Sequence, residues 1–236
     1  QGKRPRMQSS IKIVAFDADD TLWQNEEFFR EAQDTFTEML AAYVDPNDLH
    51  ATLQEVERSN IQRYGYGIKG FTLSMIETAI AVSNDKIPAQ EIHKILDMGR
   101  EMLGHPVRLL PGVETILAQL APEFHLALIT KGDLLHQEEK LAQSGLADHF
   151  DAVHIVSEKT PQTYERAFGN DASQAMMIGN SMKSDIVPAI AAGAYAVHVP
   201  AKFEWALERA PDPVGDGRFY SVNRIDEIAE VLTQIR

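Results

Sequence analysis

The stretch that most constrains the fold is a short apolar segment, residues 11–16, that runs directly into three aspartates. The segment is mostly apolar and β-branched, which is typical of a strand buried in a parallel sheet. Asp17, Asp19 and Asp20 follow at once, and their charges repel one another unless a positive charge lies among them. An acidic turn facing solvent is one reading. Because open α/β sheets bind their ligands at the carboxyl ends of strands, we expect a divalent cation here instead.

The rest of the chain predicts a sheet of this kind with one helical interruption. Further strands are expected at 125–130, 152–156, 175–178 and 194–199 and near 219–220, with helices between them and a last helix over 225–235. This alternation indicates right-handed βαβ units and a mostly parallel sheet. Residues 23–104 show only helical periodicity, with helices expected around 29–43, 49–56, 72–83 and 88–103. We therefore predict an α/β core of residues 8–22 and 105–236, interrupted by an all-α cap domain of residues 23–104.

Composition excludes several classes of function. The net charge of −13 and a pI near 5.0 argue against nucleic acid as a partner, because no basic excess neutralises phosphates. With no cysteine, disulfides and thiolate catalysis are excluded, which fits a reducing compartment. No apolar run approaches the ~18 residues of a membrane span. The basic start, residues 3–6, precedes a run too short for a secretory signal, and Met7 is a candidate natural start. We expect a cytoplasmic protein.

Four of the predicted strands end in polar residues that can carry chemistry. Besides the first aspartates, these are Thr130 with Lys131, then Lys159, and then Asn180 with Asp185. Taken singly, Thr130 could cap a helix and Lys159 could be solvated before a proline turn. Residues 179–181 could be a plain loop, and Asp185 could lie on a helix surface. In a parallel sheet, however, all carboxyl ends of strands open on one edge, so these groups can converge.

The converging residues suit phosphoryl transfer. Mg²⁺ prefers carboxylate and carbonyl oxygens, which Asp17, Asp185 and a backbone carbonyl near Asp19 could supply. A carboxylate can act as a nucleophile and form an aspartyl-phosphate. A hydroxyl, a lysine and the free N–H groups after Thr130 would hold phosphate oxygens. Asp19 could protonate the leaving oxygen and later deprotonate water.

At these positions the chain resembles the haloacid dehalogenase-like hydrolase superfamily. The segment Phe16-Asp17-Ala18-Asp19-Asp20-Thr21-Leu22 is similar to its first motif, DxDxT. Thr130, then Lys159 with Pro161, and then Gly179-Asn180-Ser181 with Asp185 resemble its second, third and fourth motifs in order. The resemblance implies a Rossmann-like core and a Mg²⁺-dependent phosphatase. It also implies that the helical insertion is a C1-type cap, which closes over the substrate.

The resemblance also implies roles for individual residues. The expected catalytic residues are Asp17 as the nucleophile, Asp19 as the general acid and base, and Lys159, which steadies Asp17 and the phosphate. The expected substrate-binding residues are Thr130, Lys131, Lys159 and Asn180, and the expected metal ligands are Asp17, the backbone carbonyl of Asp19, Asp185 and Asn180.

Two positions depart from the family pattern. Asp20 stands where the family often has glycine, and we expect its side chain to face solvent without a role. Asn180 stands where the fourth motif usually has aspartate. An amide can still offer a neutral oxygen to the metal, directly or through water. The site loses one charge, however, so we expect weaker Mg²⁺ binding.

Other functions share parts of this pattern. Dehalogenases share the nucleophile but lack an acid at the position of Asp19, phosphomutases exclude water, and a phosphate-binding protein would have no activity. We expect a small phosphorylated metabolite as substrate and leave the oligomeric state open. The candidates for specificity are Arg63, Tyr64, Tyr66 and Lys69 in the cap and Trp23, Gln24 and Asn25 after the first motif; the alternative is that the tyrosines pack in the cap and the cations are solvated.

Overall fold

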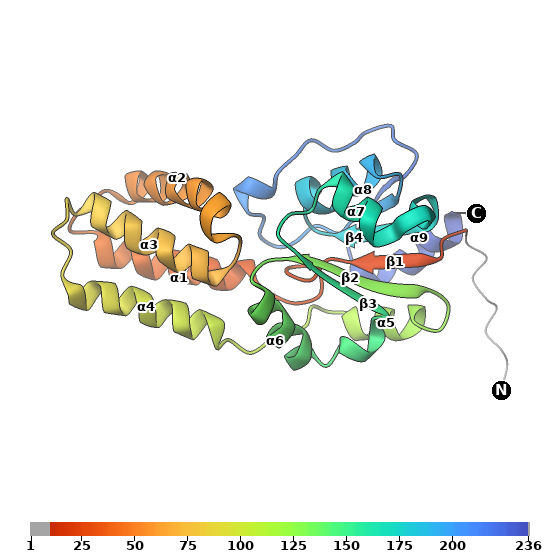
Figure 1. Cartoon of the computed structure of the whole chain (residues 1–236), viewed down its shortest axis with the longest axis horizontal. Helices are drawn as coiled ribbons and strands as arrows, with labels where there is room; N and C mark the ends of the chain where they lie inside the picture. Colours follow the sequence, from red (N-terminus) through yellow and green to blue (C-terminus); the bar gives the residue numbers. More distant parts are fainter. Residues whose placement is uncertain (1–9, 236) are drawn as a thin grey trace. The chain divides into compact units, whose positions relative to one another are not determined.

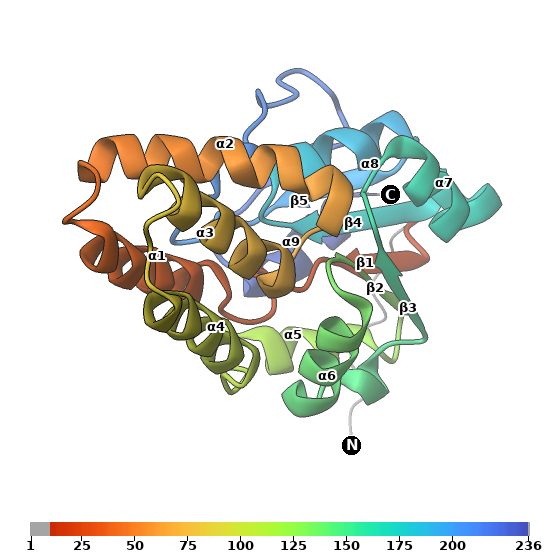
Figure 2. The same ribbon diagram turned by 60° about the vertical axis from the view of Figure 1, so that its left-hand side comes forward.

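The structure is a computed structural model that describes residues 10–235 (Figures 1 and 2). Met7, the first two predicted core residues and residue 236 lie outside the described part. Within it, the chain divides into two compact units. The core unit comprises residues 10–26, 107–131 and 137–235, and the helical unit comprises residues 27–106 with 132–136. The predicted cap, residues 23–104, falls within a few residues of the longer helical segment and does not include residues 132–136.

The core unit is built on a six-stranded sheet in the order β3-β2-β1-β4-β5-β6. Every neighbouring pair is parallel, which confirms the predicted fold class. The strands are β1 (Ile13–Phe16), β2 (His125–Lys131), β3 (Ala152–Val156), β4 (Ala175–Gly179), β5 (Tyr195–His198) and β6 (Phe219–Ser221). Because β1 lies between β2 and β4, its carboxyl end is flanked by the ends of both neighbours, where the predicted site residues stand.

The side chains of β1 point alternately to the two faces of the sheet, and helices cover both faces. Val14 and Phe16 pack with helices α5 (Val113–Leu120) and α9 (Ile228–Gln234) in one apolar cluster. Ala15 points the other way and packs with α7 (Pro161–Phe168) and α8 (Val187–Ala191). Figure 2 shows α7 and α8 on one face of the sheet and α5 on the other. Successive residues of a strand point to opposite faces of the sheet. Because helices cover both faces, β1 is apolar at every position, as the sequence shows.

The helical unit contains α1 (Glu26–Leu40), α2 (Pro46–Tyr64), α3 (Ile68–Val82) and α4 (Ala89–Leu103), packed around their own apolar core. Gly99 lets α3 and α4 approach closely, because a Cβ there would lie 2.4 Å from Thr72 Oγ1. The glycine- and aromatic-rich stretch 63–71 lies between two predicted helices, so a loop is expected there. It is reduced to a short turn, since α2 continues to Tyr64 and α3 begins at Ile68. No helix in residues 10–235 is long and apolar enough to cross a membrane.

Candidate active site

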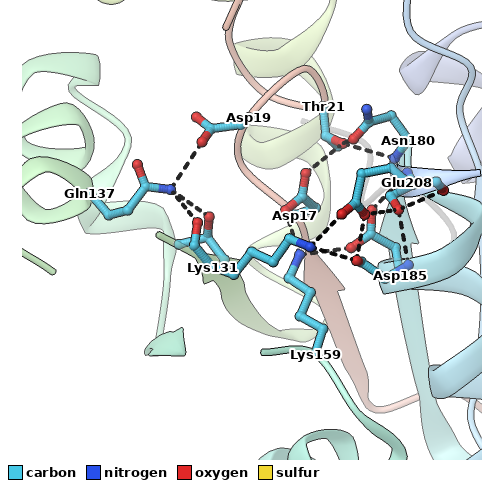
Figure 3. A network of polar contacts seen from close by, with 12 residues as sticks. Asp17, Asp19, Thr21, Lys131, Gln137, Lys159, Asn180, Asp185 and Glu208 are labelled. Carbon is cyan, nitrogen blue, oxygen red and sulfur yellow. Dashed lines mark hydrogen bonds and ion pairs between the residues drawn. The ribbon is translucent and has the colours of Figure 1, made fainter. Parts of the chain in front are cut away.

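Three of the predicted residues meet at the carboxyl end of β1. Asp17 is buried, and its Oδ1 accepts a hydrogen bond from Lys159 Nζ at 2.5 Å (Figure 3). The same ammonium donates to Asp185 Oδ1 at 2.7 Å, so one lysine lies between two carboxylates. Lys159 directly precedes the capped start of α7, where Thr160 and Pro161 begin the helix, and this fixes the backbone from which its side chain reaches the site.

Electrostatics distinguish Asp17 from an ordinary surface aspartate. Burial and the charge of Asp185 raise its pKa to about 7, although the Lys159 ammonium acts in the opposite direction. Burial by itself would lower the pKa of Lys159, but its two carboxylate partners outweigh burial and raise it. The two carboxylates therefore carry more negative charge than one lysine neutralises, and an additional cation would favour ionised Asp17.

The loop after β4 brings Asp185 to this place through a close contact with glycine. A Cβ on Gly179 would lie 2.2 Å from Asp185 Oδ2, so only glycine leaves room for the carboxylate. Residues 182–186 form one π-helical turn, and Ser181 N donates to Asp185 Oδ2 at 2.9 Å. Such turns occur frequently at functional sites. Both oxygens of Asp185 are thus hydrogen-bonded within the core unit.

Asp19 lies in a polar environment of its own. Its Oδ1 accepts from Trp23 Nε1 at 2.7 Å and from Lys140 Nζ at 2.5 Å, and its Oδ2 accepts from Gln137 Nε2 at 3.2 Å. Figure 3 shows the Asp19 carboxylate directed toward Gln137. Burial by itself would raise the pKa of Asp19, but the ion pair with Lys140 and the other hydrogen bonds outweigh it and lower that pKa. Asp19 is therefore held ionised, which is the form of a general base.

The expectation that Asp20 faces solvent was wrong. Its carboxylate accepts hydrogen bonds from the backbone N–H groups of Asn25, at 2.9 Å, and Glu26, at 2.9 and 3.1 Å, where α1 begins. Its φ of 61° is in the left-handed region, where aspartate is tolerated better than most residues and glycine is most at ease. Asp20 thus satisfies backbone donors at the start of α1. Its backbone adopts the left-handed conformation that suits the glycine often found at this position in the family.

Thr130 and Lys131 end β2 at the same edge. Thr130 is buried, and its Oγ1 accepts from Gln137 Nε2 at 2.7 Å, so its own hydroxyl hydrogen is available for another acceptor. Lys131 Nζ donates to Glu208 Oε1 at 2.5 Å and to Ser184 Oγ at 2.8 Å. Glu208 belongs to the connection between β5 and β6. Its burial favours the neutral form, but Lys131 and two serine hydroxyls outweigh burial and lower its pKa.

Asn180 lies against Asp17 and the backbone of Asp19. One end of its amide is 3.2 Å from Asp17 Oδ2, from the backbone oxygen of Asp19 and from Thr21 Oγ1. With the nitrogen on that side the amide donates to these oxygens, whereas the oxygen on that side faces acceptors (Figure 3). Turned so that its oxygen faces Asp17 Oδ2 and the backbone oxygen of Asp19, the amide would complete a set of oxygens about 3 Å from it. Neighbouring ligands in the octahedral shell of Mg²⁺, whose bonds are about 2.1 Å, have this spacing. The donor set therefore fits a magnesium ion.

The described residues contain no cluster of three or more His, Cys, Asp or Glu side chains that could hold a metal ion. The set above is compatible with that finding, because Asp17 supplies its one carboxylate. A backbone carbonyl and an amide supply the other oxygens, and such neutral oxygens also bind hard cations.

The other specificity candidates have partners of their own. Trp23 is buried against Asp19, Gln24 Oε1 is buried without a hydrogen-bond partner, and Asn25 Oδ1 accepts from Lys140 Nζ at 3.4 Å. Within the helical unit, Tyr64 donates to Glu77, Arg63 lies beside Ser59 and Asn60, and Lys69 pairs with Asp133 at 2.9 Å. Tyr66 lies in the short turn between α2 and α3.

Comparison with known families identifies the class of protein. A family model for haloacid dehalogenase-like hydrolases matches residues 11–193, which include β1 to β4 and the helical insertion. The chain belongs to this hydrolase family. The resemblance predicted from the four motifs is thereby confirmed.

Individual relatives of this hydrolase agree with the assignment. It is 39% identical to a haloacid dehalogenase-like family hydrolase from Xanthomonas campestris, with a TM-score of 0.85 over 98% of this chain and 94% of the other. A glyceraldehyde 3-phosphate phosphatase from Methanopyrus kandleri is 26% identical and aligns over 95% of this chain and 98% of its own. The YfnB hydrolase from Bacillus subtilis, solved with bound magnesium, is 17% identical, with a TM-score of 0.65 over 94% and 98%, and shares the fold.

Four residues of this hydrolase's site are not among the expected site residues. Thr21 ends the first motif, and its hydroxyl lies 3.2 Å from Asp17 Oδ2. Gln137 and Lys140 are three residues apart on α6 (Leu134–Ser144), and this spacing placed them on one helix face. Glu208 gave no signal, because an acidic residue in a polar loop is expected to be solvated.

Proposed function

We propose that this hydrolase is a Mg²⁺-dependent phosphatase that acts on small phosphomonoesters through an aspartyl-phosphate on Asp17. The observation that carries the proposal is the pair of aspartates at the end of β1. Asp17 is buried beside Lys159, and Asp19 is a second acid with hydrogen-bond partners of its own. A nucleophile and a separate acid–base group are what a two-step transfer needs.

In the first step, an oxygen of Asp17 attacks the phosphorus, an O–P bond forms, and the bond to the ester oxygen breaks. Asp19, ionised in the free protein, must first take up a proton, which it then gives to that leaving oxygen. The Thr130 hydroxyl and Lys159 hold the phosphoryl oxygens. Mg²⁺, held by Asp17, the backbone oxygen of Asp19 and the amide oxygen of Asn180, would neutralise charge on the phosphoryl group. Asp185, the other carboxylate expected to bind the metal, is hydrogen-bonded to Lys159 through Oδ1 and to Ser181 N through Oδ2.

In the second step, Asp19 removes a proton from water, whose oxygen attacks the phosphorus of the aspartyl-phosphate. The bond to Asp17 breaks, and inorganic phosphate and the free carboxylate remain. The ion pair with Lys140 supports this step, because it stabilises the ionised form of Asp19 that acts as a base.

The substrate class follows from chemistry and from relatives. Asp19 favours attack at phosphorus over attack at carbon, because an alkoxide leaving group needs a proton and a halide does not. The Methanopyrus kandleri relative is named for glyceraldehyde 3-phosphate, so a short phosphorylated aldehyde or sugar is the first class to test.

The decisive experiment measures phosphate released from p-nitrophenyl phosphate and from a panel of phosphorylated metabolites. We expect hydrolysis with Mg²⁺, its loss in EDTA, and its loss in Asp17→Asn. Asp171→Asn, a change at an aspartate about half exposed, is the matched control and keeps activity. Activity that survives both EDTA and Asp17→Asn would contradict the mechanism. Turnover of 2-chloropropionate instead would indicate a dehalogenase, transfer without phosphate release a mutase, and binding without turnover a phosphate-binding protein.

A further inference from the structure

Glu208 is a largely buried carboxylate in an otherwise polar connection. It ends a 3₁₀ turn, Ala206–Glu208, within the segment between β5 and β6. Neighbouring charged residues such as Glu204 and Arg209 are exposed and pair with each other. The Glu208 side chain is only 12% exposed and turns toward the edge of the sheet where the catalytic residues lie (Figure 3). Burying a carboxylate is costly unless its partners replace water, so these partners show what it does.

The Glu208 carboxylate is surrounded by hydrogen-bond donors. Oε1 accepts from Lys131 Nζ at 2.5 Å, and Oε2 accepts from both Ser181 Oγ and Ser184 Oγ at 2.5 Å. A carboxylate can accept several such bonds at once, whereas an amide in its place would turn a donor toward at least one of them. The carboxylate thus joins β2 to the loop after β4.

That loop leads directly to the nucleophile. Ser181 N donates to Asp185 Oδ2, Asp185 Oδ1 accepts from Lys159, and Lys159 donates to Asp17. The hydroxyl of Ser181 also accepts from the backbone N of Ser184 at 2.9 Å and so caps the π-helical turn that carries Asp185. Lys183 makes a second contact between this loop and the Glu208 segment, because its Nζ donates to the backbone oxygen of Leu207 at 2.8 Å.

Lys131 directs its ammonium into the same network. Besides Glu208, it donates to Ser184 Oγ at 2.8 Å and lies 3.7 Å from Glu158 Oε1. An ammonium has three hydrogens, and two of them are donated to Glu208 and Ser184. Lys131 therefore has an alternative to direct substrate binding, the role expected from its place after Thr130.

We propose that Glu208 is a positioning residue of this site, and that Lys131 acts through Glu208 by holding the Ser181–Asp185 loop against Asp17. The catalytic consequence depends on the proposed phosphatase function. The structural consequence, a loop that loosens when Glu208 is changed, does not.

The test uses Glu208→Gln, Lys131→Gln and the double variant, with Glu204→Gln as the matched control on the same connection. Amide hydrogen exchange across residues 181–186 is measured without metal or substrate. We expect exchange at least tenfold faster in Glu208→Gln and unchanged in the control. If Glu208→Gln fails to fold, Ser184→Ala, which removes one donor to the carboxylate, is expected to show the same direction of change.

Kinetics with p-nitrophenyl phosphate separate positioning from substrate binding. We expect each single variant to lower kcat about tenfold with KM within about twofold of the wild type. The kcat of the double variant should be no lower than that of the less active single variant, because both residues act through one network.

Two results would overturn the proposal. The first is amide hydrogen exchange across residues 181–186 that is no faster in Glu208→Gln than in Glu204→Gln. If Glu208→Gln does not fold, the same comparison is made with Ser184→Ala. The other is a raised KM in Lys131→Gln together with a lowered KM in Glu208→Gln, which would mean that Lys131 binds substrate and Glu208 competes with it. If the wild type hydrolyses no phosphoester, the proposed function fails, and the exchange measurement still decides the role of Glu208.

Discussion

Replacing Asn180 by aspartate tests the reading of the metal site most directly. The new carboxylate would lie where the amide end is now, 3.2 Å from Asp17 Oδ2 and 3.2 Å from the backbone oxygen of Asp19. Two unit charges at that distance repel by about 5 kcal/mol at an effective dielectric constant of 20 and by about 1 kcal/mol in bulk water. The hydrogen bonds donated by the amide are lost as well, at about 1 kcal/mol each.

Without metal, Asn180→Asp should therefore unfold more easily than the wild type. The repulsion and the lost hydrogen bonds add up to about 3–8 kcal/mol. At about 2–4 °C per kcal/mol for a chain of this size, the melting temperature of the core unit falls by roughly 6–32 °C in EDTA. With Mg²⁺ the order changes, because the variant offers the cation a second carboxylate. Each tenfold gain in affinity adds about 1.4 kcal/mol of stability at saturating metal. We therefore expect a larger rise in melting temperature on adding Mg²⁺ than in the wild type.

Differential scanning calorimetry in EDTA and over a Mg²⁺ titration measures both effects. Asn170→Asp, the same change at an exposed position, is the control and should leave both temperatures unaltered. Equal melting temperatures for wild type and Asn180→Asp in EDTA, together with equal responses to Mg²⁺, would refute the placement of this amide among the metal-binding oxygens.

Three further predictions concern neighbouring positions. Gly179→Ala should destabilise the protein by about 1–3 kcal/mol in urea unfolding, because its Cβ overlaps the Asp185 carboxylate 2.2 Å away; an unchanged midpoint would contradict that contact. Lys140→Met should raise the pKa of Asp19, so the basic limb of the kcat/KM profile moves to higher pH, and an unmoved limb would exclude Asp19 as the acid. Asp20→Ala should be about 1–2 kcal/mol less stable than Asp20→Gly, since only glycine accepts a φ of 61° without strain, and thermal unfolding compares the two.

The sequence was most informative where chemistry follows directly from a strand. The apolar run before Asp17 predicts β1, and parallel pairing then brings Lys159 and the loop after β4 to the same edge. Their meeting could be expected before any distance was known, because parallel strands share one carboxyl edge. In the structure, Lys159 donates hydrogen bonds to both Asp17 and Asp185, as this expectation requires.

The sequence was least informative where a side chain's role depends on a turn or a distant loop. From the sequence, Asp20 is expected to be a solvent-exposed charge. In the structure, the turn places its carboxylate against the first N–H groups of α1. Glu208 reads as solvated until the connection after β5 brings it to Lys131. Neither position shows a periodic pattern, since turn geometry and long-range packing rather than local propensity set them.

The contact between Gly179 and Asp185 limits which changes this loop can accept over evolutionary time. Position 179 excludes every side chain, and position 181 uses both its backbone N–H and its hydroxyl to hold neighbours. Between them, Asn180 alone can exchange one side chain for another while the loop keeps its path. A change between asparagine and aspartate at this one position would therefore alter the charge of the proposed metal site without a change in the path of the loop.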